Sequence, residues 1–112
     1  MKSGDYMICN DYNTWKAIMQ EELSHADSFD IHCWNEETQS IQLALQYGNI
    51  KPFDWSYGKV ISGLVTPQFI RWFMALSKLD DTEIDMKMTP FFSIFLNTGF
   101  SSEHYGTELA KL

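Results

Sequence analysis

The residues of this 112-residue chain that could support catalysis or metal binding are three histidines, two cysteines and three carboxylate doublets. The spacings typical of zinc sites, such as C-x-x-C, H-x-x-x-H and H-E-x-x-H, do not occur in the sequence. His32 and Cys33 are neighbours in an expected strand, so their side chains should point to opposite faces and cannot share a metal. We therefore expect no metal site, no cofactor and no catalytic residues.

The carboxylate doublets are Glu21-Glu22, Glu36-Glu37 and Asp80-Asp81. A catalytic acid needs an apolar environment that raises its pKa, whereas these doublets fall in expected turns and helix ends, where water reaches them. Gly-rich phosphate-binding motifs and the G-x-S-x-G motif of serine hydrolases are also missing from the sequence. The doublets are better explained as solvated surface acids, and we expect that the protein is not an enzyme.

The charge distribution is uneven along the chain. Residues 17–50 contain no Lys or Arg over 34 positions. Residues 1–56 carry nine acids and three bases, whereas residues 57–112 carry six acids and five bases. A surface with a negative field attracts a basic partner, and the net charge of −7 disfavours direct binding of nucleic acid. We expect the six acids between residues 21 and 37 to form one continuous anionic patch.

Composition indicates one globular domain spanning residues 1–112 with a core of its own, because the chain is 45% hydrophobic and 15% aromatic. The first residues lack the apolar stretch of a signal peptide, and no apolar run is long enough to span a bilayer. These features predict a cytoplasmic protein without membrane contact. Cys9 and Cys33 are then expected to be reduced thiols.

Helical periodicity over residues 11–24, with Trp15 and Leu23 on the apolar side, predicts an amphipathic helix capped by Asn10, Asp11 or Asn13. Period-two alternation then predicts strands over 29–34 and 41–47, joined by a polar turn. In the first strand Phe29, Ile31 and Cys33 should face the core, and Asp30, His32 and Trp34 should face solvent. We predict an antiparallel hairpin over about 28–47.

The remainder of the chain is less regular. Residues 57–65 are expected to be a strand rather than a helix because of their two glycines. Thr66-Pro67 predicts a helix start, with the helix continuing to about residue 79. A strand is expected over 84–88, either a helix or a strand over 91–96, and a weak helix over 101–109. The fold class is therefore α+β: one antiparallel sheet with helices packed on one face.

The solvent-facing side of the predicted hairpin is the candidate binding site. A large aromatic residue, Trp34, should stand beside Asp30 and His32, and an aromatic surrounded by acids is typical of a protein–protein hot spot. The alternative is that a helix covers this face and Trp34 belongs to the core. The predicted partner-binding residues are Glu21, Glu22, Asp27, Asp30, His32, Trp34, Glu36 and Glu37.

In its size, its acidity and its missing catalytic motifs, the chain resembles the small cytosolic immunity proteins of bacterial contact-dependent growth inhibition. The resemblance implies an inhibitor without a cofactor that binds a basic toxin domain, with a nuclease as the leading candidate because nuclease sites are cationic. Three alternatives stay open. They are a phage-encoded antagonist that mimics nucleic acid, a small cofactor-free enzyme using Asp30, His32 or a thiol, and a structural subunit of an oligomer.

Overall fold

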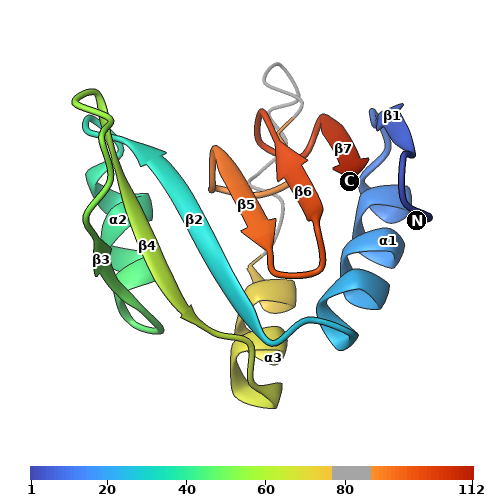
Figure 1. The fold of residues 1–112 in the computed structure, drawn as a ribbon, viewed down its shortest axis with the longest axis horizontal. Coiled ribbons are helices and arrows are strands. Elements are labelled where there is room, and N and C mark those ends of the chain that lie inside the picture. The colour runs from blue at the N-terminus through green and yellow to red at the C-terminus, as the bar shows by residue number, and fades with distance from the viewer. Residues whose placement is uncertain (77–86) are drawn as a thin grey trace.

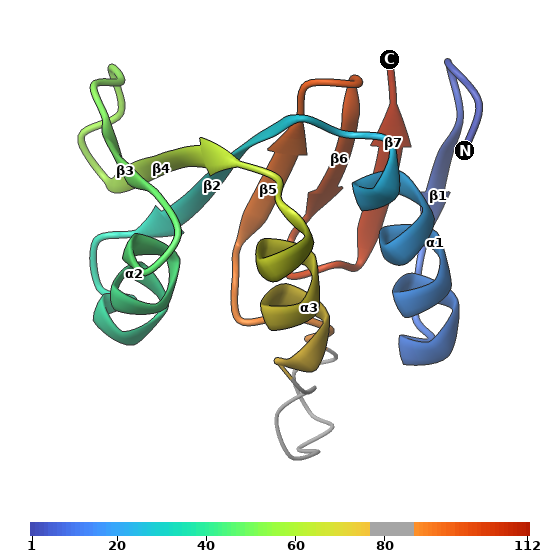
Figure 2. The same cartoon turned by 90° about the horizontal axis from the view of Figure 1, so that it is seen from below.

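Seven strands form one antiparallel sheet, and three helices lie against one of its faces in the computed structural model, which describes residues 1–76 and 87–112 (Figures 1 and 2). The helices are α1 (Tyr12–Ser24), α2 (Thr38–Leu45) and α3 (Pro67–Ala75). The strands are β1 (Tyr6–Ile8), β2 (Ser28–Trp34), β3 (Asn49–Lys51), β4 (Gly58–Leu64), β5 (Ser93–Leu96), β6 (Phe100–Glu103) and β7 (Glu108–Lys111). Their order across the sheet is β1-β7-β6-β5-β2-β4-β3. The predicted α+β class with helices on one face is confirmed.

Two of the three helices form where their capping residues predict. The Asp11 carboxylate accepts a hydrogen bond from the Thr14 N–H at 2.9 Å and starts α1. The Thr66 hydroxyl accepts from the Phe69 N–H at 3.0 Å, with proline at the first helical position of α3. Helix α3 ends at Ala75, because its C-cap Leu76 has an extended backbone, and residues 77–79 of the predicted helix lie outside the described residues.

The core lies between the helices and the face of the sheet that they cover. Phe29 of β2 stacks on Phe69 of α3 with ring centroids 4.2 Å apart, and Phe73 stacks on Phe91 at 5.7 Å. Trp15 and Met19 bring α1 into the same core. The radius of gyration is 13.0 Å, close to the value of about 13 Å expected for one domain of this length. Among the described residues, no helix combines the length and apolar character needed to cross a membrane.

The predicted hairpin over 28–47 is half wrong. Its first strand is β2, but residues 41–45 belong to helix α2, and β2 pairs with β4 and β5 instead. Ile41, Leu43 and Leu45 alternate, but Ile41, Ala44 and Leu45 also follow the i, i+3, i+4 spacing of a helix. Leu, Ala and Gln favour the helix, and Ala44 becomes its fully buried residue.

The C-terminal region is a set of strands. The expected strand over 57–65 is confirmed as β4, and the open choice for 91–96 resolves to strand β5. The weak helix predicted over 101–109 is wrong, because β6 and β7 form a hairpin there. Its turn needs left-handed backbone at His104, Tyr105 and Gly106, with φ of 53°, 61° and 94°. The strand expected over 84–88 lies mostly outside the described residues, as does Asp80-Asp81.

Candidate protein-binding face

The face of the sheet opposite the helices carries no helix in the described part of the chain (Figure 2). We call it the uncovered face. Residues that pair directly across antiparallel strands share a face, so Asp30 lies beside Ser62 of β4 and Phe95 of β5. Burial in β2 alternates: Phe29, Ile31 and Cys33 are buried, while the residues between them are half-buried. The predicted sidedness of this strand is therefore confirmed.

Aromatic side chains gather around His32 on the uncovered face. The imidazole ring lies 4.8 Å from the Phe95 ring, 5.5 Å from the Phe53 ring and 5.6 Å from the Trp55 ring. Trp34 extends this group, with its ring 5.1 Å from that of Trp55. Phe53 is 58% exposed and Phe95 is 36% exposed. We call this set the aromatic cluster: His32, Trp34, Phe53, Trp55 and Phe95.

The connection between β3 and β4 brings two members of the aromatic cluster over the sheet. Asn35, just after β2, fixes the connection: its side-chain amide donates to the Ser56 carbonyl and its backbone N–H to the Tyr57 carbonyl, both at 2.9 Å. Gly58 allows the Trp55 ring to approach the strand, because a Cβ there would lie 2.4 Å from that ring. Phe53 and Trp55 could not be predicted as part of the site, because this segment has no periodicity in the sequence.

Asp30 of β2 is a carboxylate on the uncovered face. It accepts hydrogen bonds from the Ser62 hydroxyl at 2.5 Å and from the Lys51 ammonium at 2.9 Å. Burial alone would raise its pKa, but these hydrogen bonds and the charge of Lys51 outweigh burial and lower the pKa. Asp30 is therefore ionised at neutral pH.

His32 behaves mainly as a packing group. Its burial among aromatic rings lowers its pKa below the ordinary value of 6.5, although the charges of Asp30 and Glu103 act in the opposite direction. The imidazole is therefore neutral at pH 7. The Asp30 oxygens accept from Ser62 and Lys51, whereas the imidazole of His32 packs against the rings of Phe53, Trp55 and Phe95.

The other predicted acids do not form the expected continuous patch. Glu21 and Asp27 are exposed near the start of β2, whereas Glu36 is exposed beyond its end. A seven-residue strand separates these ends by roughly 20 Å at 3.3 Å per residue. The distance places the two groups on different parts of the surface, so the prediction of one patch is wrong.

Two predicted partner contacts are used inside the protein. Glu22 is 1% exposed, and its carboxylate binds the Met1 ammonium at 2.6 Å and the Lys111 ammonium at 3.0 Å. The Glu37 carboxylate accepts from the Trp34 N–H at 2.9 Å and from the Tyr105 hydroxyl. Glu22 is thus unavailable to a partner, and Glu37 holds the end of β2.

Two further acids lie on the uncovered face, because Glu103 pairs with Ser93, which in turn pairs with His32. Glu103 of β6 and Glu108 of β7 are direct cross-strand partners, so their charges face each other. Glu103 also accepts from the Ser101 hydroxyl at 2.8 Å. Nothing in the local sequence indicated them, because this segment was expected to be helical. Together with Asp30, they give the uncovered face an acidic character beside the aromatic cluster.

Two histidines pair with carboxylates, His25 with Glu21 at 3.1 Å and His104 with Glu108 at 2.7 Å. Both histidine side chains are more than half exposed, at 63% and 52%, so no apolar pocket encloses either pair. Within residues 1–76 and 87–112, no three His, Cys, Asp or Glu side chains converge as a metal site would require.

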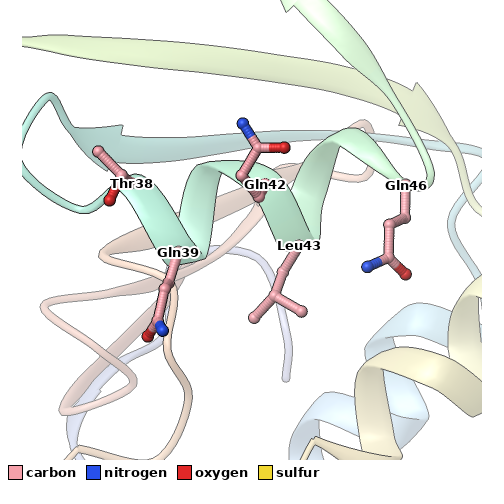
Figure 3. Close-up of a pocket in the computed structure, with 5 residues that line it drawn as sticks. All are labelled: Thr38, Gln39, Gln42, Leu43 and Gln46. Atoms are coloured by element: carbon pink, nitrogen blue, oxygen red, sulfur yellow. The ribbon is translucent and has the colours of Figure 1, made fainter.

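A separate hollow of about 500 Å³ lies beside α2, on the helical side of the molecule (Figure 3). Gln39, Leu43 and Gln46 project from one side of the helix into this region, and Thr38 and Gln42 complete the lining. None of these five side chains titrates or carries a charge. The lining of this hollow therefore supplies no charged side chain for acid–base chemistry.

Both thiols are free and buried. Burial raises the pKa of Cys33 to about 12, and the charge of Glu37 adds to this effect. Because both thiols are buried, and burial also disfavours the reactive thiolate of Cys33, we expect iodoacetamide at pH 8 to leave both cysteines unmodified in the folded protein and to label both in 6 M guanidinium. Mass spectrometry of the alkylated protein measures this. Rapid labelling of Cys33 under native conditions would contradict its burial in the core.

Comparison with protein-family models, with curated proteins and with solved structures finds no match for this chain. The candidate site consequently rests on the geometry and charge of the uncovered face.

Proposed function

We propose that this protein is a non-enzymatic inhibitor that binds a basic protein partner through the uncovered face of its sheet. The observation that carries the proposal is the aromatic cluster, partly exposed on a sheet face that no described helix covers. Trp, Phe and Tyr side chains held rigidly by their neighbours form effective interface anchors, since little side-chain entropy is lost when a partner covers them.

Charge indicates the kind of partner. The chain carries a net charge of −7, and Asp30, Glu103 and Glu108 lie on the same face as the aromatic cluster. Acidic groups beside an apolar centre attract a basic surface and accelerate association. A toxin domain, in particular a nuclease with a cationic phosphate-binding cleft, has the complementary charge. This partner fits an immunity protein acting in the cytosol, where free thiols such as Cys9 and Cys33 persist.

The proposal is tested by capturing partners from the native cell with the tagged protein and two variants that change charge equally. Phe95→Lys alters the uncovered face, and Gln68→Lys alters an exposed position on α3. We expect the wild type and Gln68→Lys to retain one basic protein that Phe95→Lys loses. The purified wild type should also inhibit the activity of that protein. Equal recovery by both variants, or recovery of no basic protein, would contradict the proposal.

Electrostatic steering makes a separate prediction for the association rate. Glu103→Lys should slow association with the basic partner several-fold at low salt and flatten its salt dependence. The fold should tolerate the change, because the new ammonium would face Glu108 across the β6–β7 pair. Stopped-flow kinetics over a range of salt concentrations measures the rate. Glu21→Lys, an equal charge change at the exposed end of α1, is the control and should have a much smaller effect.

A further inference from the structure

A hollow of about 230 Å³ opens on the uncovered face next to the aromatic cluster. Asp30, Lys51 and Phe95 contribute to its lining, together with Ser28 and Asn97. Asp30 and Phe95 are direct cross-strand partners of β2 and β5, so the carboxylate and the ring stand side by side on this face. The hollow thus combines the Asp30–Lys51 ion pair with an exposed aromatic ring.

The polar groups of this hollow are held in fixed positions. The Ser62 hydroxyl binds one oxygen of the Asp30 carboxylate at 2.5 Å and so orients the group. The side-chain oxygen of Asn97 accepts the N–H groups of Asp27 and Ser28 at 2.7 and 3.1 Å, which fixes the start of β2. Because the carboxylate is preorganised in this way, a ligand that binds it in a defined geometry loses less entropy on binding.

Lys51 holds the second oxygen of Asp30, and its contact is easily broken. The Lys51 side chain is 47% exposed, and it belongs to β3, a three-residue edge strand whose residues are all exposed. Exposed ion pairs contribute little stability, because water solvates both charges well. The Lys51 ammonium can therefore move into solvent without disturbing the core.

We propose that this hollow receives an arginine side chain of the partner, with Lys51 holding the Asp30 carboxylate until the partner binds. The inference rests on the proposed function and adds the chemistry of the central contact. A guanidinium group can bind a carboxylate through two parallel hydrogen bonds and stack on an aromatic ring at once. An ammonium group is a point charge and does neither as well. Asp30 and Phe95 offer both contacts from neighbouring strands.

The probe is N-acetyl-arginine methylamide, titrated into the full chain and followed by two-dimensional NMR. We expect weak binding, with a Kd of about 1 mM or higher, and shifts at residues 30, 95 and 97. Lys51→Ala should tighten binding several-fold because it removes the competing cation. Asp30→Asn should abolish binding. The matched lysine probe should bind at least several-fold more weakly than the arginine probe.

Phe95→Leu provides a second variant if Asp30→Asn fails to fold, because it keeps an apolar side chain but removes the aromatic face. We expect it to weaken arginine binding several-fold and to abolish the preference over lysine. Each of three results would overturn the inference: equal binding of the arginine and lysine probes to Lys51→Ala, undiminished binding of the arginine probe to Phe95→Leu, or no shift at residues 30 and 95.

The two proposals fail separately. The probe titration needs no partner. If the arginine probe does not bind but Phe95→Lys still loses the partner, the proposed arginine contact is wrong and the docking face remains supported. If the arginine probe binds but Phe95→Lys and Gln68→Lys capture the partner equally well, the uncovered face is not the site of inhibition.

Discussion

Replacing Glu22 by Gln should lower the free energy of unfolding by about 3 kcal/mol at pH 7, the loss typical of breaking a buried ion pair. The Glu22 carboxylate is almost fully buried between two cations, the Met1 ammonium and the Lys111 ammonium. The neutral amide would leave both cations without a compensating charge in a partly buried site. Urea denaturation followed by circular dichroism measures the change.

Glu21→Gln is the matched control for this prediction. Glu21 is the preceding residue on α1, and its side chain is 65% exposed and pairs with His25. An exposed ion pair of this kind contributes less than about 1 kcal/mol. Equal stability losses in the two variants would contradict a specific role of the buried Glu22 pair.

The pH dependence of stability follows from the same site. Burial raises the pKa of Glu22, but hydrogen bonds and charges from Met1 and Lys111 outweigh burial, so the pKa lies below its ordinary value of 4.5. A carboxyl with a lowered folded-state pKa stabilises the protein above the unfolded-state value and loses this contribution as the pH falls through the folded-state value. Glu22→Gln should therefore reduce the loss of stability below pH 4.5, as acid titration of the unfolding midpoint would show.

Trp34→Ala should weaken binding of the basic partner by about 2 kcal/mol or more, mainly through faster dissociation. Trp34 is half-buried in the free protein, and its ring contacts Trp55 at 5.1 Å and Phe92 at 4.9 Å. These contacts hold the ring in place on the uncovered face before the partner arrives. Surface plasmon resonance with the captured partner gives the dissociation rate.

Trp72→Ala is the matched control, because Trp72 is a half-buried tryptophan of α3 that packs on Tyr47 and Phe91 at the helical side. Both variants lose aromatic packing contacts and should lose stability, which circular dichroism records. Only Trp34→Ala should change the dissociation rate. An unchanged rate for Trp34→Ala would remove this residue from the binding site.

The sequence was most informative where its pattern permitted one structure. The alternation of Phe29, Ile31 and Cys33 with polar neighbours fits only a strand buried on one face, and the structure confirms it. Residues 41–45 fit both a strand and a helix, so the strand predicted from their alternation alone is wrong. The β6–β7 hairpin was missed because its turn includes two non-glycine residues with left-handed backbone.

The candidate site could be predicted only in part, because its contacts join distant parts of the chain. Asp30, His32 and Trp34 were found from a single strand, but Phe53, Phe95 and Glu103 reach the same face from other segments. Glu22 pairs with Lys111, which is 89 positions away in the chain, so the local sequence does not show that the charge of Glu22 is neutralised. The number of acidic residues in the sequence therefore overestimates the negative charge exposed near β2.

Hydroxyl-radical footprinting of the protein alone and in complex with its captured partner tests the docking face most directly, because the method reports the accessibility of side chains. We expect protection of Phe53, Trp55 and Phe95 in the complex, with Tyr12 and Trp72 on the helical side unchanged. Protection of the helical side, with the aromatic cluster as reactive in the complex as in the free protein, would contradict binding through the uncovered face.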